Sequence, residues 1–396
     1  MRAKSGGSRA RHNSRLWPLR ALLFLLCAPK RMLESTRILR GIQAGDGAHP
    51  RVQRTTLAYR SRGNARTGDL YRADDPRAGL VLVPGVTLLG KEDPRLIAFA
   101  QALARAHFEV LVPDLPGLKN LRVCADDAGT IADALSALSL HRAAQGNATV
   151  GLIAICYSTG PAMIALLDER IRGVAQFMLA IGGYYDIEAV IGFITTGRYR
   201  NPVDGTECHR VPDEYGKWVF AISNADALEN EQDRELLDSM ARRRLDDDKA
   251  DISDLASGLS DEGRRVYAVL ENRDPERVAA LIASLPRHVV DEIAKLDLKR
   301  RDFSGLEMRF ILIHGNDDAI IPETESIALA RALPGADVFI LNSMRHVDPG
   351  PARFADKLKM LAAIQALLQE RDKVRPPGAP VAESPLQPPA GPCGES

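Results

Sequence analysis

The chain has 396 residues, more than the roughly 100–200 residues of a typical domain, which predicts one large domain with an insertion or two domains. Lysine plus arginine equals aspartate plus glutamate at 52 each. This balance argues against a nucleic-acid or acidic-polymer partner and favours a small substrate. The five cysteines are scattered and include no Cys-x-x-Cys pair, which argues against a disulfide framework, a zinc site and an oxidising compartment.

Residues 1–48 are predicted to form a basic and apolar N-terminal extension. Basic residues precede a short apolar run at 21–28, as they do at the start of a signal peptide, but the run is too short to span a bilayer. No good cleavage site follows it. We therefore expect a cytoplasmic protein whose translation begins at Met32 or which carries a loose extension. Membrane association or export through this segment is the alternative.

Between residues 49 and 186, short apolar runs alternate with amphipathic stretches, which is typical of a parallel sheet with helical crossovers. The predicted strands cover residues 53–60, 68–73, 79–83, 109–113, 149–155 and 173–181, and the predicted helices cover 94–106 and 130–140. The same pattern returns at 307–372, with strands at 308–314 and 337–341 and helices at 323–333 and 351–370. Residues 373–396 are rich in proline and glycine and predict a disordered tail.

The interval 187–306 differs from both flanking parts because it is charge-rich and helical. Its predicted helices cover residues 213–223, 231–245, 261–271 and 275–285. An insertion between two strands of such a sheet usually covers the carboxyl ends of the strands, where ligands bind. We therefore predict an α/β fold with a mostly parallel twisted sheet, flanked by helices, and a helical lid insertion. A separate accessory domain that never touches the site is the alternative.

A candidate nucleophile turn follows the apolar strand that ends at residue 155. Residues 154–160 are Ala-Ile-Cys-Tyr-Ser-Thr-Gly, so Cys156 has the small residues Ala154 and Ser158 two positions away on either side. A nucleophile between a strand and a helix needs such small neighbours because the turn is sharp. The following segment, 159–167, is a predicted helix whose amino end would lower the pKa of the thiol.

Here the chain resembles the α/β-hydrolase family, and in particular its dienelactone hydrolase branch, which has a cysteine in the Gly-x-Cys-x-Gly position. Ala154 and Ser158 replace the two glycines. A second alignment is possible, in which Ser158 is the nucleophile between Cys156 and Gly160. Pro161 favours Ser158 because it then falls in the first helical turn. The length of the preceding strand favours Cys156, which we prefer.

The resemblance also assigns an acid and a base, since this fold places nucleophile, acid and histidine in that chain order. Residues 315–322, Gly-Asn-Asp-Asp-Ala-Ile-Ile-Pro, are similar to the family's acid turn and put Asp318 in the place of the acid. Asp186 is the second choice. His346 lies in the loop after the last strand, where the family's histidine lies. His314 lies within a strand, where we expect a buried hydrogen bond.

The family's oxyanion hole uses the amide after the nucleophile and one from the loop after the third strand. Residues 84–90 form that loop here, so Val86 and Tyr157 are the expected donors, with Thr159 replacing Tyr157 if Ser158 attacks.

The resemblance covers residues 50–186 and 305–370. It implies an enzyme of the carboxylic ester hydrolase class that forms an acyl-enzyme on a small ester, lactone or thioester, without a metal or organic cofactor. A catalytically inactive protein that binds a small molecule or a partner, or an acyltransferase, is the alternative. The sequence predicts neither the natural substrate nor the oligomeric state.

Overall fold

The computed structural model describes residues 29–44, 51–346, 348–349 and 354–373. Most of the predicted N-terminal extension (1–28 and 45–48) and the predicted disordered tail from residue 374 onward therefore lie outside the described residues. None of the helices in these described ranges is long and apolar enough to cross a membrane.

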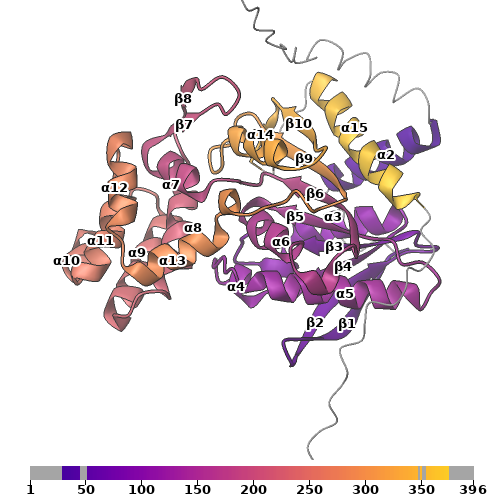
Figure 1. The fold of residues 1–396 in the computed structure, drawn as a ribbon, viewed down its shortest axis with the longest axis horizontal. Coiled ribbons are helices and arrows are strands. Elements are labelled where there is room, and N and C mark those ends of the chain that lie inside the picture. The colour runs from indigo at the N-terminus through magenta and orange to yellow at the C-terminus, as the bar shows by residue number, and fades with distance from the viewer. Residues whose placement is uncertain (1–28, 45–50, 347, 350–353, 374–396) are drawn as a thin grey trace, which may run out of the picture.

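A central sheet organises the molecule (Figure 1). In the described part of the chain, eight strands join it in the order β1-β2-β4-β3-β5-β6-β9-β10. They are β1 (Gln53–Ser61), β2 (Asn64–Arg72), β3 (Ala78–Val83), β4 (Phe108–Pro113), β5 (Val150–Ile155), β6 (Ala175–Ile181), β9 (Arg309–Gly315) and β10 (Asp337–Leu341). Strand β2 runs antiparallel to both of its neighbours, and the remaining pairs are parallel. This order is that of the α/β-hydrolase fold, and the predicted mostly parallel sheet flanked by helices is confirmed.

Helices cover both faces of the sheet, which explains why its inner strands are continuous apolar runs. Every residue of β3 and β4 is buried. One face packs against α2 (Pro29–Ala44), α3 (Pro94–Arg105) and α15 (Phe354–Arg371). The other face packs against α5 (Asp127–Ala143), α6 (Thr159–Ala165) and α14 (Glu323–Ala332), with the short α4 (Pro116–Lys119) nearby.

Helix α2 differs from the prediction, because the sequence analysis placed its residues in an extension. Its Ile38 and Ser35 are buried, and its Glu34 pairs with the buried Arg371 of α15 at 2.9 Å. The helix was missed because its sequence is charge-rich and buries few apolar side chains.

The segment 187–306 forms a group of helices beside the sheet (Figure 1). Its elements are α7 (Ile187–Thr196), β7 (Arg198–Arg200), β8 (Glu207–His209), α8 (Glu214–Ala225), α9 (Glu231–Asp246), α10 (Ser253–Ser257), α11 (Asp261–Leu270), α12 (Val278–Ala283) and α13 (Arg287–Leu296). Helices α7, α10 and α13 and the β7–β8 hairpin were not predicted. The helix predicted at 275–285 is shorter, because a 3-10 turn at Pro275–Arg277 precedes α12.

Candidate functional site

Cys156 lies where β5 ends at the carboxyl edge of the sheet. Its backbone has a φ of +59°, a region that residues other than glycine rarely occupy and that costs free energy. Such a sharp turn lifts the residue out of the strand. The loop after β3 lies against it, because a Cβ built on Gly85 would be 3.8 Å from the Cβ of Cys156. The side chain of Cys156 is therefore held between two loops and is almost fully buried.

A 3-10 turn at Cys156–Ser158 separates β5 from α6. Because α6 begins at Thr159, Pro161 is its third residue, where a missing amide removes no helical hydrogen bond. The conflict between Pro161 and a nucleophile at Cys156 therefore does not arise in the structure.

Ser158 points back into this turn. Its hydroxyl donates to the carbonyl oxygen of Ile155 at 2.7 Å and lies 3.2 Å from the Ile155 amide, which can donate to it. The side chain is completely buried. Both interactions close the turn that presents Cys156, so Ser158 acts as a structural hydroxyl in this arrangement.

Asp318 follows β9 and is completely buried. Its Oδ1 accepts hydrogen bonds from the amides of Ile320 at 2.8 Å and Ile321 at 2.9 Å. Its Oδ2 lies 2.8 Å from Nδ1 of His346 and 3.3 Å from Nε2 of His314. Burial alone would raise the pKa of Asp318, but the hydrogen bonds from the two histidines hold this pKa well below its usual value. The carboxylate is therefore charged throughout the physiological pH range.

His314 makes the buried hydrogen bonds expected from its place in a strand. Its Nε2 lies 2.9 Å from the carbonyl oxygen of Ile321, and its Nδ1 lies 2.7 Å from the hydroxyl of Ser326. A carbonyl can only accept, so Nε2 carries the proton and Nδ1 accepts from Ser326. His314 is thus a fixed donor beside Asp318.

His346 lies at the tip of a short hairpin between β11 (Met344–Arg345) and β12 (Asp348–Pro349). Its φ of +49° is also unusual for a residue with a side chain. Gly315 allows this hairpin to approach, because a Cβ there would lie 2.1 Å from the carbonyl oxygen of Met344. Close approach of the two backbones places His346 over Asp318.

The imidazole of His346 connects Asp318 with Cys156. Burial by itself would lower the pKa of His346, but the Cys156 sulfur and the hydrogen bonds to Cys156 and Asp318 raise this pKa well above its ordinary value. The ring is therefore a proton donor at neutral pH when Cys156 carries the negative charge. The structure thus brings together all three residues that the sequence analysis selected, Cys156, Asp318 and His346.

The two expected oxyanion donors lie beside Cys156. Val86 and Tyr157 are nearly buried, and their backbone N–H groups meet no acceptor among the described residues. The phenol of Tyr157 is likewise buried and has no partner in the described ranges. Burial raises the pKa of Tyr157 well above its usual value, so the phenol remains a neutral donor.

The segment 187–306 contacts both loops of the site. Tyr215 of α8 donates its hydroxyl to the carbonyl oxygen of Val86 at 2.8 Å. The amide of Asp213 donates to the carbonyl oxygen of Ala319 at 2.8 Å. These two hydrogen bonds join the segment to the loop after β3 and to the loop after β9.

Arg210 of the same segment holds the acid loop. Its guanidinium donates to the carbonyl oxygens of Asp318 and Asn316, both at 2.6 Å, and pairs with Glu323 at 3.2 Å. It also donates to the hydroxyl of Tyr199 at 2.9 Å. Sequence reasoning missed this residue because nothing in the local sequence distinguishes it from the many surface arginines.

Asp186, the second choice for the acid, is used elsewhere. Its carboxylate caps α7 by accepting from the amides of Glu188 and Ala189, and it pairs with Lys299 at 2.7 Å. The loop before it does reach the site, because a Cβ on Gly182 would lie 3.7 Å from both Asp318 and His346.

In the comparisons with known proteins, only solved structures match the chain. No family profile and no curated protein matches the chain. Among solved structures, it is similar to a hypothetical protein from Pseudomonas aeruginosa, with 15% identity over 83% of this chain and 96% of that one and a TM-score of 0.44. It is also similar to a dienelactone hydrolase-like promiscuous phosphotriesterase from metagenomic libraries, with 12% identity over 81% and 98% and a TM-score of 0.40. An uncomplexed acylaminoacyl peptidase from Pyrococcus horikoshii matches with 11% identity and a TM-score of 0.44 over 78% of this chain, which spans only 40% of the peptidase.

Proposed function

We propose that the protein is an acyl hydrolase that cleaves a small ester, lactone or thioester through an acyl-enzyme on Cys156. The observation that carries the proposal is the single imidazole of His346, which lies 2.8 Å from Asp318 and close enough to Cys156, at its strained turn, for the sulfur to raise the pKa of the ring. A cysteine, an imidazole and a carboxylate arranged with the imidazole in the middle generate and stabilise a thiolate–imidazolium pair.

In the proposed reaction, the Cys156 thiolate attacks the carbonyl carbon of the substrate. The N–H groups of Val86 and Tyr157 donate to the oxygen that becomes negative, which is supported by their lack of other acceptors among the described residues. His346 then protonates the leaving group, and the sulfur keeps the acyl group. A water molecule that gives its proton to His346 attacks the thioester, and the acid leaves.

The contacts of Ser158 support sulfur over oxygen as the nucleophile. The Ser158 hydroxyl donates to Ile155, whereas the hydrogen bonds that raise the pKa of His346 come from Cys156 and Asp318. An attack by Ser158 would require this hydroxyl to leave the turn that it closes.

We also propose that the segment 187–306 acts as the lid of this site. The hydrogen bonds from Tyr215 to Val86 and from Asp213 to Ala319 support this role. They join the segment to the loop after β3 (84–90), which carries the proposed oxyanion donor, and to the loop after β9 (315–322), which carries the acid.

Pre-steady-state kinetics with p-nitrophenyl acetate tests the chemistry. The wild-type protein should release a burst of p-nitrophenol stoichiometric with enzyme, and Cys156→Ala should abolish it. Ser158→Ala removes a hydroxyl that closes the nucleophile turn but does not react, so this variant should slow the burst without abolishing it. A burst that persists in Cys156→Ala, or turnover that His346→Ala leaves unchanged, would show that the proposal is wrong.

A further inference from the structure

A cavity lies at the opposite edge of the sheet from Cys156. It has a volume of about 650 Å³ and is lined by α2, the end of α3, the turn before β1 and the turns after β2 and before β4. His107 directly precedes β4, so the cavity lies at the amino end of that parallel strand, whereas Cys156 follows the carboxyl end of β5. Six-residue strands of this kind are about 20 Å long. The cavity is therefore separate from the candidate active site.

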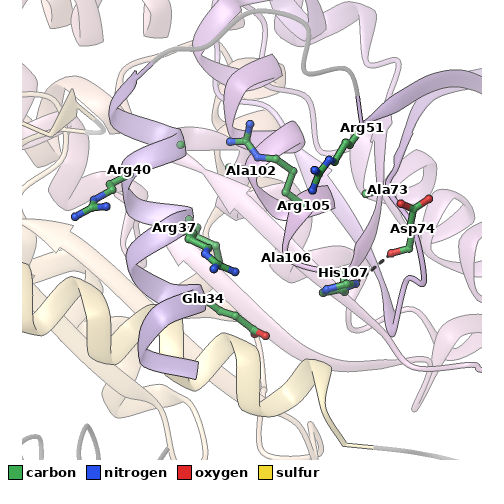
Figure 2. Close-up of a pocket in the computed structure, with 12 residues that line it drawn as sticks. Glu34, Arg37, Arg40, Arg51, Ala73, Asp74, Ala102, Arg105, Ala106 and His107 are labelled. Atoms are coloured by element: carbon green, nitrogen blue, oxygen red, sulfur yellow. Dashed lines mark hydrogen bonds between the residues drawn. The ribbon is translucent and has the colours of Figure 1, made fainter. Parts of the chain in front are cut away.

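Arginines dominate the lining of this cavity. Arg37 and Arg40 come from α2, Arg51 from the turn before β1, and Arg105 from the last residue of α3. Figure 2 shows Arg51 and Arg105 entering the cavity from two different segments, with the guanidinium of Arg105 directed toward α2. We call the space between these four side chains the arginine cavity.

Among the described residues that line the arginine cavity, positive charges outnumber negative charges. Its carboxylates belong to Glu34 and Asp74, and Glu34 is already paired with Arg371 at 2.9 Å outside the lining. Within the described ranges, Arg37 and Arg105 form no ion pair. Arg37 is exposed and Arg105 is partly exposed, so both guanidinium groups are accessible to an anion.

Two backbone features shape the cavity. A Cβ on Gly41 would lie 2.3 Å from Nη2 of Arg105, so a glycine inside α2 allows the guanidinium to lie against the helix. A glycine in a helix interior costs about 1 kcal/mol relative to alanine. His107 has a φ of +63°, and its Nδ1 lies 3.1 Å from the carbonyl oxygens of both Asp74 and Asp75. These carbonyls fix the ring in the cavity wall.

The chemistry of the lining selects the ligand. Guanidinium groups bind phosphate oxygens through paired hydrogen bonds, and several arginines from different segments suit several phosphates. A volume of this size falls in the range of about 300–1,000 Å³ that is usual for small-molecule sites. We propose that the arginine cavity binds a molecule that carries at least two phosphate groups, independently of the acyl hydrolase site.

Isothermal titration of the full-length protein with inorganic pyrophosphate tests binding of a free ligand. We expect one pyrophosphate per chain, with affinity reduced about tenfold or more in Arg37→Ala and in Arg105→Ala, since each loses charge-assisted hydrogen bonds. Arg265→Ala is the matched control, because Arg265 is exposed on the distant α11. Ester hydrolysis should be unchanged in all three variants.

Co-sedimentation distinguishes a phospholipid headgroup as the source of the phosphates. Phosphatidylcholine vesicles with and without phosphatidylinositol 4,5-bisphosphate are compared, using the wild type and the double variant Arg37→Ala/Arg105→Ala. Sedimentation that requires the phosphorylated lipid and is lost in the double variant supports a membrane source, and pyrophosphate binding without sedimentation supports a soluble one. Failure of both probes to bind, or binding that the double variant retains, overturns the proposal.

Discussion

Asp318 and Cys156 both lie next to His346, but the surroundings of the two residues differ. Asp318 accepts hydrogen bonds from two backbone amides and from His346, its Oδ2 lies 3.3 Å from Nε2 of His314, and Arg210 donates to its carbonyl oxygen. Around Cys156, by contrast, the amides of Val86 and Tyr157 and the phenol of Tyr157 have no partner among the described residues.

Buried polar groups without partners are costly, and protein structures normally avoid them. Among the described residues, such unpaired groups lie beside Cys156 and not beside Asp318. We therefore assign different roles to the residues on the two sides of His346. The acid loop is a fixed support, because the carboxylate of Asp318 accepts hydrogen bonds from two amides of its own loop and from His346. The nucleophile turn keeps donors for an oxygen atom that a substrate brings.

The largest effect on kcat should follow from removing the negative charge of Asp318. We expect Asp318→Asn to lower kcat about 10³–10⁴-fold, because the amide no longer stabilises the imidazolium form of His346. Asp317→Asn is a matched control, since Asp317 is adjacent but exposed, and it should leave kcat unchanged. Steady-state kinetics measures both variants, and equal activities would remove Asp318 from the mechanism.

An intermediate effect on kcat is expected when the acid loop loses its hydrogen bonds from Arg210. Arg210→Ala should lower kcat roughly 10- to 100-fold with a smaller change in KM, because misplacing a catalytic group weakens the chemical step more than binding. Arg210→Lys should recover part of the loss, and Arg198→Ala, on the same hairpin, should behave like the wild type. The pH profile of kcat/KM should also change in Arg210→Ala, because the hydrogen bond between Asp318 and His346 changes. An unchanged profile would show that Arg210 supports only stability.

The smallest effect on turnover, within about twofold, should come from a second buried carboxylate. Glu325 accepts hydrogen bonds from the amides of Tyr185 and Asp186 in the loop that follows Gly182. Burial raises the pKa of Glu325 to about 7. A carboxyl whose pKa is raised by folding stabilises the protein fully below its unfolded pKa of about 4.5, and this contribution is lost as the pH rises through 7.

Glu325→Gln should therefore gain stability relative to the wild type as the pH rises from about 4.5 to 7. The gain should amount to at most roughly 3.5 kcal/mol, since one pKa unit corresponds to about 1.4 kcal/mol. Urea unfolding at several pH values measures the difference. A difference that does not depend on pH would show that Glu325 is charged in both states.

The core of the fold could be predicted from the sequence because its inner strands are buried on both faces and are continuously apolar. Asp318 and His346 could be selected because each lies in a local pattern at the end of such a strand. The antiparallel direction of β2 was not predicted, because alternation of strands and helices does not define strand direction. Helix α2 and the role of Arg210 depend on contacts with distant segments, which local patterns do not contain.

The choice between Cys156 and Ser158 likewise depends on contacts that the local sequence pattern does not contain. Sequence spacing favoured Cys156 and Pro161 favoured Ser158. The structure removes the conflict through a 3-10 turn of three residues, which the hydroxyl of Ser158 closes by bonding to Ile155. Such a turn depends on the packing of the neighbouring loop at Gly85, so residue types alone do not predict it.

Mass spectrometry of the acyl-enzyme tests the central claim most directly. The protein is mixed with p-nitrophenyl acetate, quenched in acid and digested with trypsin, which releases residues 143–170 as one peptide. Fragment ions of this peptide distinguish a modified Cys156 from a modified Ser158. We predict an acetyl group on the sulfur of Cys156, and its yield should fall strongly in His346→Ala. An acetyl group on Ser158, or a wild-type peptide without any acetyl group, would contradict the account.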